Sequence, residues 1–332
     1  MISYVWSEHL GDGARAEALA LVREAARYDE EAGFSVVEPW DVEAVTREGE
    51  EQVWHLPVKA RRDLSIREDA PVLMVAYLHL SVDPHGQGTV KLVVHPDYRS
   101  RGIATLLVEE LGLDISPPGG WCGTGATSLR SWAYGSHPAS ERLTRRFGIK
   151  PVARLWTLLR HLSGPFAMPL EPIRLPGGVI VEGPSGLTES ATTARVSDVL
   201  ERAGLTRAQF DQFGSEFAAR SGQVLIASVA SGRPVGFVWF DPHLREHLDL
   251  RAARVHALIL VSDIRGGGLG AALLTRALQE LVAAGTQLAQ IRVDPAHEGA
   301  LRMLRLLSFE QEDAHACYQI GEWIDPPAFP GR

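Results

Sequence analysis

Hydrophobic and polar positions follow two different periods along this chain, and together they predict an α/β protein. Short apolar runs rich in Val, Leu and Ile predict strands, whereas an apolar residue at every third or fourth position predicts a helix. In the first half the expected helices are 14–31, 102–111 and 138–147, and the expected strands are 71–81, 90–95, 128–134 and 152–159. In the second half the expected helices are 187–203, 207–220, 269–284 and 299–307, and the expected strands are 224–230, 235–241, 255–261, 288–293 and 314–320.

One segment of the first half recurs in the second half. Residues 92–104 align without gaps with residues 258–270, so that Arg99 and Gly102 correspond to Arg265 and Gly268. In each copy an apolar strand leads through a short polar turn into a helix that opens with glycine. A repeat of this kind predicts two domains of the same fold.

Chain length and a stretch rich in proline and glycine agree with this division. A chain of 332 residues suits two domains of about 160 residues each. Residues 161–178 combine four prolines with three glycines, which is typical of a linker. The expected domains are therefore 1–163 and 179–332, joined by a linker at 164–178. A second such stretch, 112–125, is expected to be a surface loop within the first domain.

Charge and cysteine content narrow the class of protein. The formal net charge is −8 and there is no polybasic run, which argues against a nucleic-acid partner. No apolar stretch reaches the roughly 18–20 residues of a membrane span, and the first ten residues do not resemble a secretory signal. Cys122 and Cys317 lie far apart without metal-ligand spacing, so we expect reduced thiols. A cytoplasmic protein that binds no membrane is the simplest expectation.

The repeated turn has the chemistry of an anion site. Each copy reads Arg-x-x-Gly-x-small: Arg99, Gly102 and Ala104 in the first, and Arg265, Gly268 and Gly270 in the second. The first N–H groups of a helix have no partner within the helix, and the helix dipole adds partial positive charge there. Glycine lets the backbone approach a pyrophosphate, and nearby arginines can donate further hydrogen bonds.

Other phosphate-binding and catalytic motifs are absent from the sequence. No Gly-Lys-Ser/Thr follows the glycines, and no acidic residue stands where a dinucleotide fold needs one. The Gly-x-Ser-x-Gly turn of serine hydrolases is missing as well. His243 and His247 flank a charged segment, 241–249, that reads as a loop without the further ligands a structural zinc needs. Trp156, Trp239 and Trp323 are expected to pack in the protein interior.

The pattern resembles the acetyl-CoA motif of the GNAT acetyltransferases. Arg-x-x-Gly-x-Gly/Ala lies between a strand and its following helix. Residues 293–309, which end in Leu-Ser-Phe, are similar to that family's fifth strand and its helix ending in Leu-Gly-Phe. Phe147-Gly148-Ile149 occupies the matching place in the first half. Residues 92–96, 99–102, 132–135 and 155–162 further resemble the mycothiol synthase family, which has two GNAT domains.

This resemblance implies a fold and a co-substrate. The fold is α/β with two tandem GNAT-like domains, each a mixed, mostly antiparallel sheet flanked by helices. Acetyl-CoA would be the acyl donor, with no metal, and the backbone of the strand edge would pair with its pantetheine amides. The implied cofactor-binding residues are Leu92, Val93, Val94, Arg99, Ser100, Arg101, Gly102, Ile103, Ala104 and Thr105 in the first domain, and Leu258, Ile259, Leu260, Arg265, Gly266, Gly267, Gly268, Leu269, Gly270 and Ala271 in the second.

The chain departs from the family at its catalytic positions. Where mycothiol synthases have a glutamate this chain has Arg254, and where GNAT enzymes often have a tyrosine it has Leu304. Arginine cannot accept a proton in a protein, so another residue must serve as the base. His256, two residues from Arg254 on the same strand, suits this role by its reference pKa.

Further candidates follow the next strand. Asp294 is one additional catalytic candidate. His297, at the position where the family usually has an asparagine, is another. Glu51 matches an acidic substrate-contacting position of the family, and Arg254 and Arg292 are the other candidate substrate-binding residues. The oxyanion would be held by a backbone N–H of strand 258–260, which needs no particular side chain.

The expected function is acetyl-CoA-dependent N-acetylation of a small-molecule amine by direct attack. The resemblance points to the cysteinyl amine of a cysteine–glucosamine–inositol conjugate, the mycothiol precursor. Two alternatives stay open: a GNAT enzyme for another small amine, and a non-catalytic acyl-CoA-binding protein in which the sites have decayed. A monomer or weak homodimer is expected, and the sequence leaves open which domain turns over.

Overall fold

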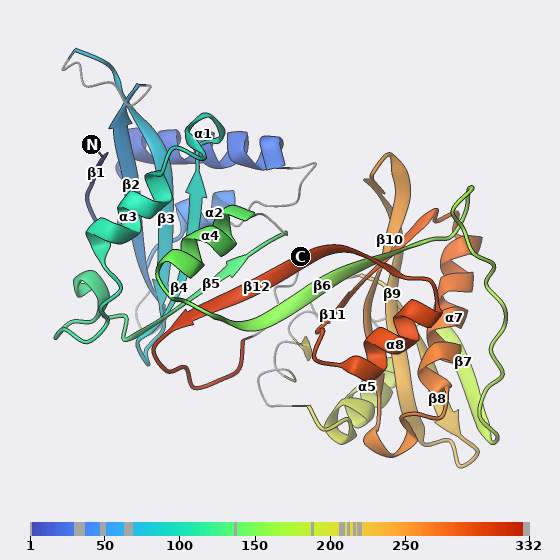
Figure 1. Ribbon diagram of the computed structural model, residues 1–332. Helices are drawn as coiled ribbons and strands as arrows, with labels where there is room; N and C mark the ends of the chain where they lie inside the picture. The colour runs from blue at the N-terminus through green and yellow to red at the C-terminus, as the bar shows by residue number, and fades with distance from the viewer. Residues whose placement is uncertain are drawn as a thin grey trace. The chain divides into compact units, whose positions relative to one another are not determined.

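The computed structural model describes residues 2–29, 37–46, 51–62, 69–135, 138–186, 189–205, 210, 213–214, 217 and 221–327. The chain forms two compact units (Figure 1). The first unit comprises Met1–Arg154 together with His315–Pro327, and the second is built on Leu155–Ala314.

In its described residues the first unit is a mixed sheet flanked by four α-helices. Its strands, in the order in which they neighbour one another, are β1 (Ile2–Tyr4), β2 (Gln52–Arg61), β3 (Val72–Val82), β4 (Gln87–Val94), β5 (Ser128–Ala133) and β12 (Glu310–Ile320), which belongs to this unit from His315 onward. Only the β4–β5 pair is parallel among the pairs of this unit. The helices are α1 (Asp12–Asp29), α2 (Pro39–Glu43), α3 (Ile103–Leu111) and α4 (Pro138–Arg146).

The second unit repeats this plan. Its strand order is β6 (Pro151–His161), which belongs to this unit from Leu155 onward, then β11 (Leu288–Val293), β10 (Leu250–Leu260), β9 (Pro234–His247), β8 (Gln223–Val229) and β7 (Val179–Gly186). Again one pair, β10–β11, is parallel and the others are antiparallel. Helices α5 (Ser190–Arg202), α7 (Leu269–Ala283) and α8 (Glu298–Leu306) flank this sheet.

Each unit has its own hydrophobic core, because both faces of each sheet are covered. In the second unit the largest fully buried side chains are Phe237, Trp239 and Phe240 of β9. In the first unit one cluster lies between the sheet and α3, around Leu107, and another lies under α1, around Tyr77. The parallel strand pair of each sheet therefore lies between two packed layers, as parallel pairs usually do.

The units differ from the sequence halves in their last strands. β6 precedes the proline-rich stretch, yet it pairs with β11 of the second unit. β12 ends the chain, yet it pairs with β5 of the first unit, with Ala316 opposite Ala133. Residues 164–178 contain no helix or strand, and they join β6 to β7 within the second unit. The predicted domain bounds, 1–163 and 179–332, therefore differ from the bounds of the two compact units. Whether the predicted domains fold independently stays a prediction.

The elements around the repeat were predicted well, and several others were missed. The sequence pattern did not predict β1, α2, β2 or β7. The charged segment 241–249 was wrongly expected to be a loop, since β9 continues to His247 and turns into β10 at Leu248 and Asp249. Both turn residues have positive φ, at 51° and 58°, as a two-residue hairpin turn requires. The predicted helix at 207–220 lies mostly outside the described residues.

No helix in the described part of the chain is long and apolar enough to cross a membrane.

Candidate functional site

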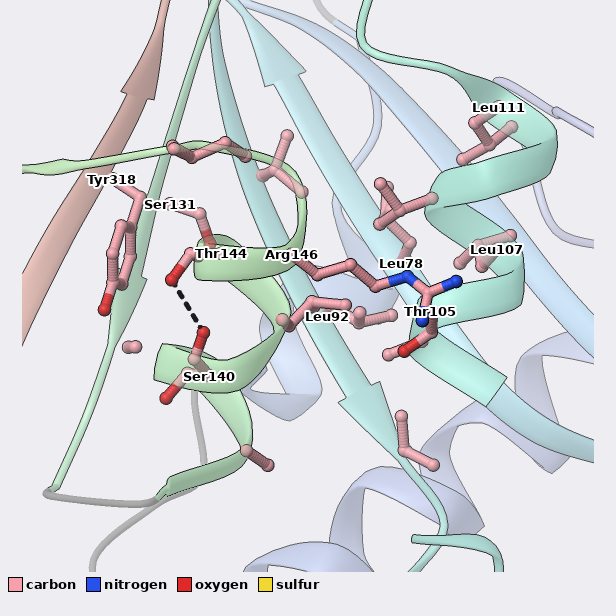
Figure 2. A pocket seen from close by; sticks show the side chains of 18 of the residues that line it. Leu78, Leu92, Thr105, Leu107, Leu111, Ser131, Ser140, Thr144, Arg146 and Tyr318 are labelled. Carbon is pink, nitrogen blue, oxygen red and sulfur yellow. Dashed lines mark hydrogen bonds between the residues drawn. The ribbon is translucent and has the colours of Figure 1, made fainter. Parts of the chain in front are cut away.

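The parallel strands of the first unit separate partway along their length. Pairing between β4 and β5 runs from Gln87 opposite Ser128 to Thr89 opposite Arg130. Beyond this point β4 continues to Val94, paired with β3, and β5 continues to Ala133. A cavity of about 750 Å³ opens here, lined by β4, β5, α3 and α4 together with the end of β12 (Figure 2). This volume lies within the usual range of small-molecule sites.

A helix N-terminus forms one end of this cavity. Gly102 caps α3 in the left-handed conformation, with φ +83°, and the helix begins at Ile103. An added Cβ at Gly102 would meet nothing within 4 Å, so the backbone is open to a ligand on this side. Ser100, Ala104 and Thr105 also line the cavity. The free N–H groups of this first turn suit an anion such as a pyrophosphate.

The structure brings most of the predicted first-unit cofactor residues to this cavity. Arg101 instead lies over the ring of Tyr98, 5.2 Å from its centroid. The wall contains Leu92, Val93, Val94, Arg99, Ser100, Gly102, Ile103, Ala104 and Thr105.

The repeated arginine has a structural partner in both units. Arg99 Nε donates to the carbonyl oxygen of Val94 at 3.1 Å, and Arg265 Nε donates to that of Leu260 at the same distance. Arg265 also donates to the carbonyl oxygen of Ala203 at 2.6 Å. Each guanidinium thus ties the turn to the end of the preceding strand.

The second unit has the same arrangement. β10 pairs with β11 from Ala252 opposite Leu288 to Val255 opposite Ile291, and it then continues to Leu260 beside β9. Gly268 caps α7 with φ +83°, as Gly102 caps α3. Gly270 is a packing position, because an added Cβ would lie 3.2 Å from the Met303 sulfur.

His256 lies at a β-bulge beside this opening. Val255 pairs with Phe240 and Ala257 pairs with Trp239, so His256 is the extra residue of β10. Its ring lies against Trp239, with the ring centroids 4.4 Å apart. Arg254 pairs with Asp241, which shares the Trp239 face of β9 by the period of two. His256 and Arg254 therefore lie on one face of β10, as the sequence predicted.

Asp241 is a neighbour that the sequence analysis did not single out. It is 5% exposed and accepts hydrogen bonds from the backbone N–H of His243 at 3.0 Å and from its ring at 2.6 Å. Burial by itself would raise the pKa of Asp241, but the hydrogen bonds from His243 and the charges of His243 and His256 lower it. Asp241 is therefore a buried carboxylate close enough to His256 for its charge to interact with that ring. A polar residue at the end of the apolar run 235–241 was the available signal.

The other catalytic candidates form the turn between β11 and α8. Asp294 Oδ1 accepts the backbone N–H of Ala296 at 2.8 Å, and the N–H of His297 donates to the Asp294 carbonyl oxygen. His297 is the N-cap residue of α8. Leu304, where a tyrosine would serve as acid, is 1% exposed and packs in the core. Leucine has no acidic proton, so this position cannot act as the general acid.

The candidate substrate-binding residues are divided between the units. Glu51 is exposed and directly precedes β2 in the first unit. Arg254 donates from Nε and a terminal nitrogen to Gln290 Oε1, at 3.1 and 2.8 Å, and Arg292 lies on β11 opposite Thr157.

His247 interacts with Glu312, and this hydrogen bond raises the pKa of His247. Among the described residues no group of three or more His, Cys, Asp and Glu could hold a metal.

Both units thus have a mixed sheet with one splayed parallel pair, and each pair is connected through a glycine-capped turn and a helix. The chain belongs to the GNAT acetyltransferase family, and it is an acetyltransferase. The model of the acetyltransferase (GNAT) family matches residues 193–309. This family uses acetyl-CoA.

Two curated relatives and one solved structure resemble this chain over most of its length. The chain is 31% identical to a mycothiol acetyltransferase of Saccharomonospora viridis, over 76% of this chain and 82% of the relative. It is 29% identical to the mycothiol acetyltransferase of Streptomyces avermitilis, over 93% and 92%. A tandem GNAT protein from the clavulanic acid biosynthesis pathway shares the fold, with a TM-score of 0.60 and 18% identity over 96% of this chain and 98% of that one.

Proposed function

We propose that this protein transfers the acetyl group of acetyl-CoA to the cysteinyl amine of the mycothiol precursor. Relatives named mycothiol acetyltransferase cover most of this chain and support the choice of acceptor. The observation that carries the proposal is the matching pair of helix N-termini, capped by Gly102 and Gly268, at splayed parallel strands. Backbone donors at both turns suit the diphosphate of coenzyme A.

We assign the transfer itself to the second unit, where a titratable side chain stands beside the strand opening. His256 would accept a proton from the acceptor ammonium group, which is mostly protonated at neutral pH. Asp241 would stabilise the imidazolium so formed. The free amine then attacks the thioester carbonyl carbon, and a backbone N–H of Leu258–Leu260 holds the oxyanion. The C–S bond breaks, the attacking nitrogen loses its second proton to water, and the thiolate that leaves takes a proton from the imidazolium or from water.

Arg254 and Arg292 would orient the acceptor rather than carry its proton. Arginine stays charged in proteins, so it can donate hydrogen bonds to sugar hydroxyl or carboxyl oxygens but cannot serve as a base. Asp294 and His297 stay candidates for assisting the proton transfer. Their turn-forming hydrogen bonds leave one carboxylate oxygen and the imidazole ring for that task.

A direct assay tests the acceptor. The purified full chain is incubated with acetyl-CoA and a panel of amines that includes the cysteinyl conjugate, an amino acid and a polyamine. Free CoA and the N-acetylated product are separated by chromatography, because the conjugate has a thiol of its own that would react with thiol reagents. Turnover on the conjugate well above the other amines is expected. Turnover on a different amine would show that the proposed acceptor is wrong, while the assignment as an acetyltransferase would stand.

Two observations favour a second candidate, a non-catalytic acyl-CoA-binding protein. Arg254 stands where the family has a glutamate and is already bound to Gln290, and buried Leu304 replaces the usual acid. Binding of acetyl-CoA by calorimetry, with no turnover on any amine of the panel, would favour this candidate.

A further inference from the structure

Two charged side chains span the cavity of the first unit. Arg146, the last residue of α4, lines the cavity and extends across it toward Thr105 of α3 (Figure 2). Its guanidinium donates to a carboxylate oxygen of Glu109, one helical turn beyond Thr105, at 2.5 Å. The ion pair therefore connects the two helices that flank the cavity.

Arg146 extends toward the turn of α3 whose backbone donors precede the helical hydrogen bonds. The first hydrogen bond of this helix runs from the N–H of Leu106 to the carbonyl oxygen of Gly102, at 2.9 Å. The N–H groups of residues 103–105 precede it, so α3 itself offers them no acceptor. These are the donors that suit a diphosphate, and Arg146 adds positive charge beside them.

The arginines of the turn itself have other contacts. Arg99 ties the turn to the end of β4, and Arg101 lies over an aromatic ring. Arg142, one turn before Arg146 on α4, also lines the cavity. Helix α4 therefore adds positive charge on the side of the cavity opposite α3 (Figure 2).

The partner of Arg146 is one that a phosphate can replace. The side chains of Arg146 and Glu109 are 60% and 41% exposed, and an ion pair in water contributes little to stability. A diphosphate has more negative charge and more acceptor oxygens than a carboxylate, and the guanidinium fork matches phosphate geometry. Exchange of the carboxylate for a diphosphate would therefore cost little and would leave the arginine paired.

The second unit has uncharged residues at the corresponding positions. By the repeat, Glu109 corresponds to Thr275 of α7, which is buried. The match between the ends of α4 and α8 places Leu306, which is 82% exposed, at the position of Arg146. The two units would therefore contact the phosphates of a coenzyme through different side chains.

We propose that Arg146 binds the diphosphate of coenzyme A in the first unit, and that Glu109 holds this arginine across the cavity until the coenzyme replaces the carboxylate. The inference rests on the proposed function, because it takes the turn at Gly102 as the diphosphate site. It adds a binding residue from a second helix, so that the ligand is held from both sides of the cavity. The diphosphate is assigned rather than the 3′-phosphate, because Arg146 extends toward the first turn of α3.

Calorimetry on the full chain tests this assignment. A Gly268→Val background weakens binding at the second turn, and CoA and dephospho-CoA are titrated in turn. Arg146→Leu, which copies the second unit, is expected to weaken CoA binding by roughly tenfold, because a charge-assisted contact to phosphate is lost. Dephospho-CoA keeps the diphosphate and should lose affinity by the same factor.

Glu109→Gln distinguishes a ligand contact from a merely structural ion pair. If Arg146 binds the diphosphate, removal of the competing carboxylate should tighten CoA binding by about twofold to fivefold. If the ion pair serves only to hold α4 against α3, Glu109→Gln would weaken binding as Arg146→Leu does, which would overturn the inference. Arg146→Lys keeps the charge without the planar fork, so its affinity should lie between those of Arg146→Leu and the parent.

The neighbouring arginine of α4 provides a matched control. Arg145 is paired with Glu141 of the same helix at 3.1 Å, and Arg145→Leu is expected to leave CoA affinity nearly unchanged. An equal loss in Arg145→Leu would mean that only the net charge of α4 matters, and it would overturn the inference. A loss confined to CoA, with dephospho-CoA unaffected, would place Arg146 at the 3′-phosphate and overturn the diphosphate assignment.

Failure of the inference can be distinguished from failure of the proposed function. CoA binding that Gly102→Val abolishes but Arg146→Leu leaves unchanged would overturn the inference alone. If CoA does not bind, or if Gly102→Val leaves its binding intact, the turn at Gly102 is not the diphosphate site, and both the inference and this part of the proposed function fail. Acetyl transfer by the unaltered chain then still tests the second unit.

Discussion

At the scale of single residues, the turns before α3 and α7 depend on left-handed backbone positions. Gly102 and Gly268 both have φ +83°, and Gly266 has the same φ at a position where the first unit has Ser100 at +60°. A side chain with a Cβ pays about 1–2 kcal/mol in this conformation, and a β-branched one is the least suited. Ser100 shows that one of the two positions tolerates a small side chain.

Gly268→Val is expected to lower the free energy of unfolding by about 1–2 kcal/mol, because valine is strained at positive φ. It should also weaken CoA binding by the second unit, since a branched side chain would stand where phosphate must approach. Chemical denaturation and calorimetry, with the first turn already altered by Gly102→Val, measure the two effects. Gly266→Ser, which copies the first unit, is expected to cost little stability. Unchanged CoA affinity in Gly268→Val would refute the assignment of this turn.

The role of His256 is tested by the pH dependence of turnover. His256→Ala is expected to reduce kcat by about tenfold or more at pH 7 and by much less at pH 9, because free amine is plentiful at high pH. His256→Gln keeps a planar group against Trp239 and should be equally slow at pH 7. His85→Ala, at an exposed position of the first unit, is the matched control. A pH–rate profile identical to that of the unaltered chain would remove His256 as the base.

The two thiols are expected to differ in reactivity. Cys317 on β12 is 0% exposed, and burial raises its pKa to about 11, so almost no thiolate exists at pH 8. Cys122 is exposed, although partial burial of its thiol raises its pKa as well. Iodoacetamide at pH 8 should therefore modify Cys122 in the native protein and Cys317 only in denaturant. Peptide mass spectrometry identifies the modified site, and rapid native alkylation of Cys317 would contradict its buried position.

At the scale of elements, neighbouring strands of the first unit hold a buried polar cluster. His55 of β2 hydrogen-bonds through its ring to the Tyr77 hydroxyl of β3 at 2.6 Å. Lys91 of β4 forms an ion pair with buried Asp41 of α2 at 2.7 Å. His79 of β3 lies among these groups, 4% exposed, and burial lowers its pKa to about 4 despite the opposing effect of Asp41. Burial lowers the pKa of His55 as well.

This cluster predicts that the first unit loses stability in mild acid. In the unfolded chain this histidine has a pKa near 6.5, so it is protonated below that pH. In the folded protein His79 stays neutral down to about pH 4, so between these two pH values the unfolded state binds one proton more than the folded state. Stability is therefore complete above pH 6.5 and falls as the pH drops toward 4, by roughly 2–3 kcal/mol for His79. The charges of Asp41, Lys91 and His55 all act on the His79 ring.

Denaturant unfolding at pH 7.5 and pH 5 measures this loss. His79→Gln removes the titrating ring and should flatten the dependence over this interval, even if it lowers stability at neutral pH. His85→Gln, an exposed histidine close in sequence, should keep the full dependence. An unaltered slope in His79→Gln would mean that another group causes the loss.

At the scale of the whole molecule, each unit takes its last strand from the other half of the sequence. β12 supplies Tyr318, Gln319 and Ile320 to the wall of the first-unit cavity, although these residues lie near the end of the chain. A strand that pairs with β5 and closes a cavity contributes both backbone hydrogen bonds and apolar burial. The first unit should therefore not fold fully from the first half of the sequence.

Expression of residues 1–163 and 179–332 as separate chains tests this prediction. The first fragment lacks β12 and leaves the edge of β5 unpaired, which favours aggregation. The second fragment lacks β6 and leaves one edge of β11 unpaired, although β11 still pairs with β10. Size-exclusion chromatography and circular dichroism should show poorly folded fragments, and a second fragment extended to residue 151 should be better behaved. Two monomeric fragments that each unfold cooperatively would instead support the sequence halves as folding domains.

The sequence by itself determined the local structure around the repeat. Apolar periodicity and glycine placement depend on neighbouring residues only, and they predicted α3, α7, β11 and α8 to within a residue or two. The resemblance in residues 92–104 and 258–270 also indicated the family, because a phosphate cradle is a local backbone feature. The bulge at His256 and its neighbour Asp241 could not be predicted in this way.

Only the tertiary structure decided which distant segments meet. The exchange of β6 and β12 depends on pairing between strands far apart in the sequence, and the period of a strand does not specify its partner. The charged ends of β9 and β10 form a hairpin because each strand satisfies the other's backbone, which hydropathy does not reveal. The cavity beside α3 likewise depends on where the parallel strands β4 and β5 separate, which no local pattern in the sequence specifies.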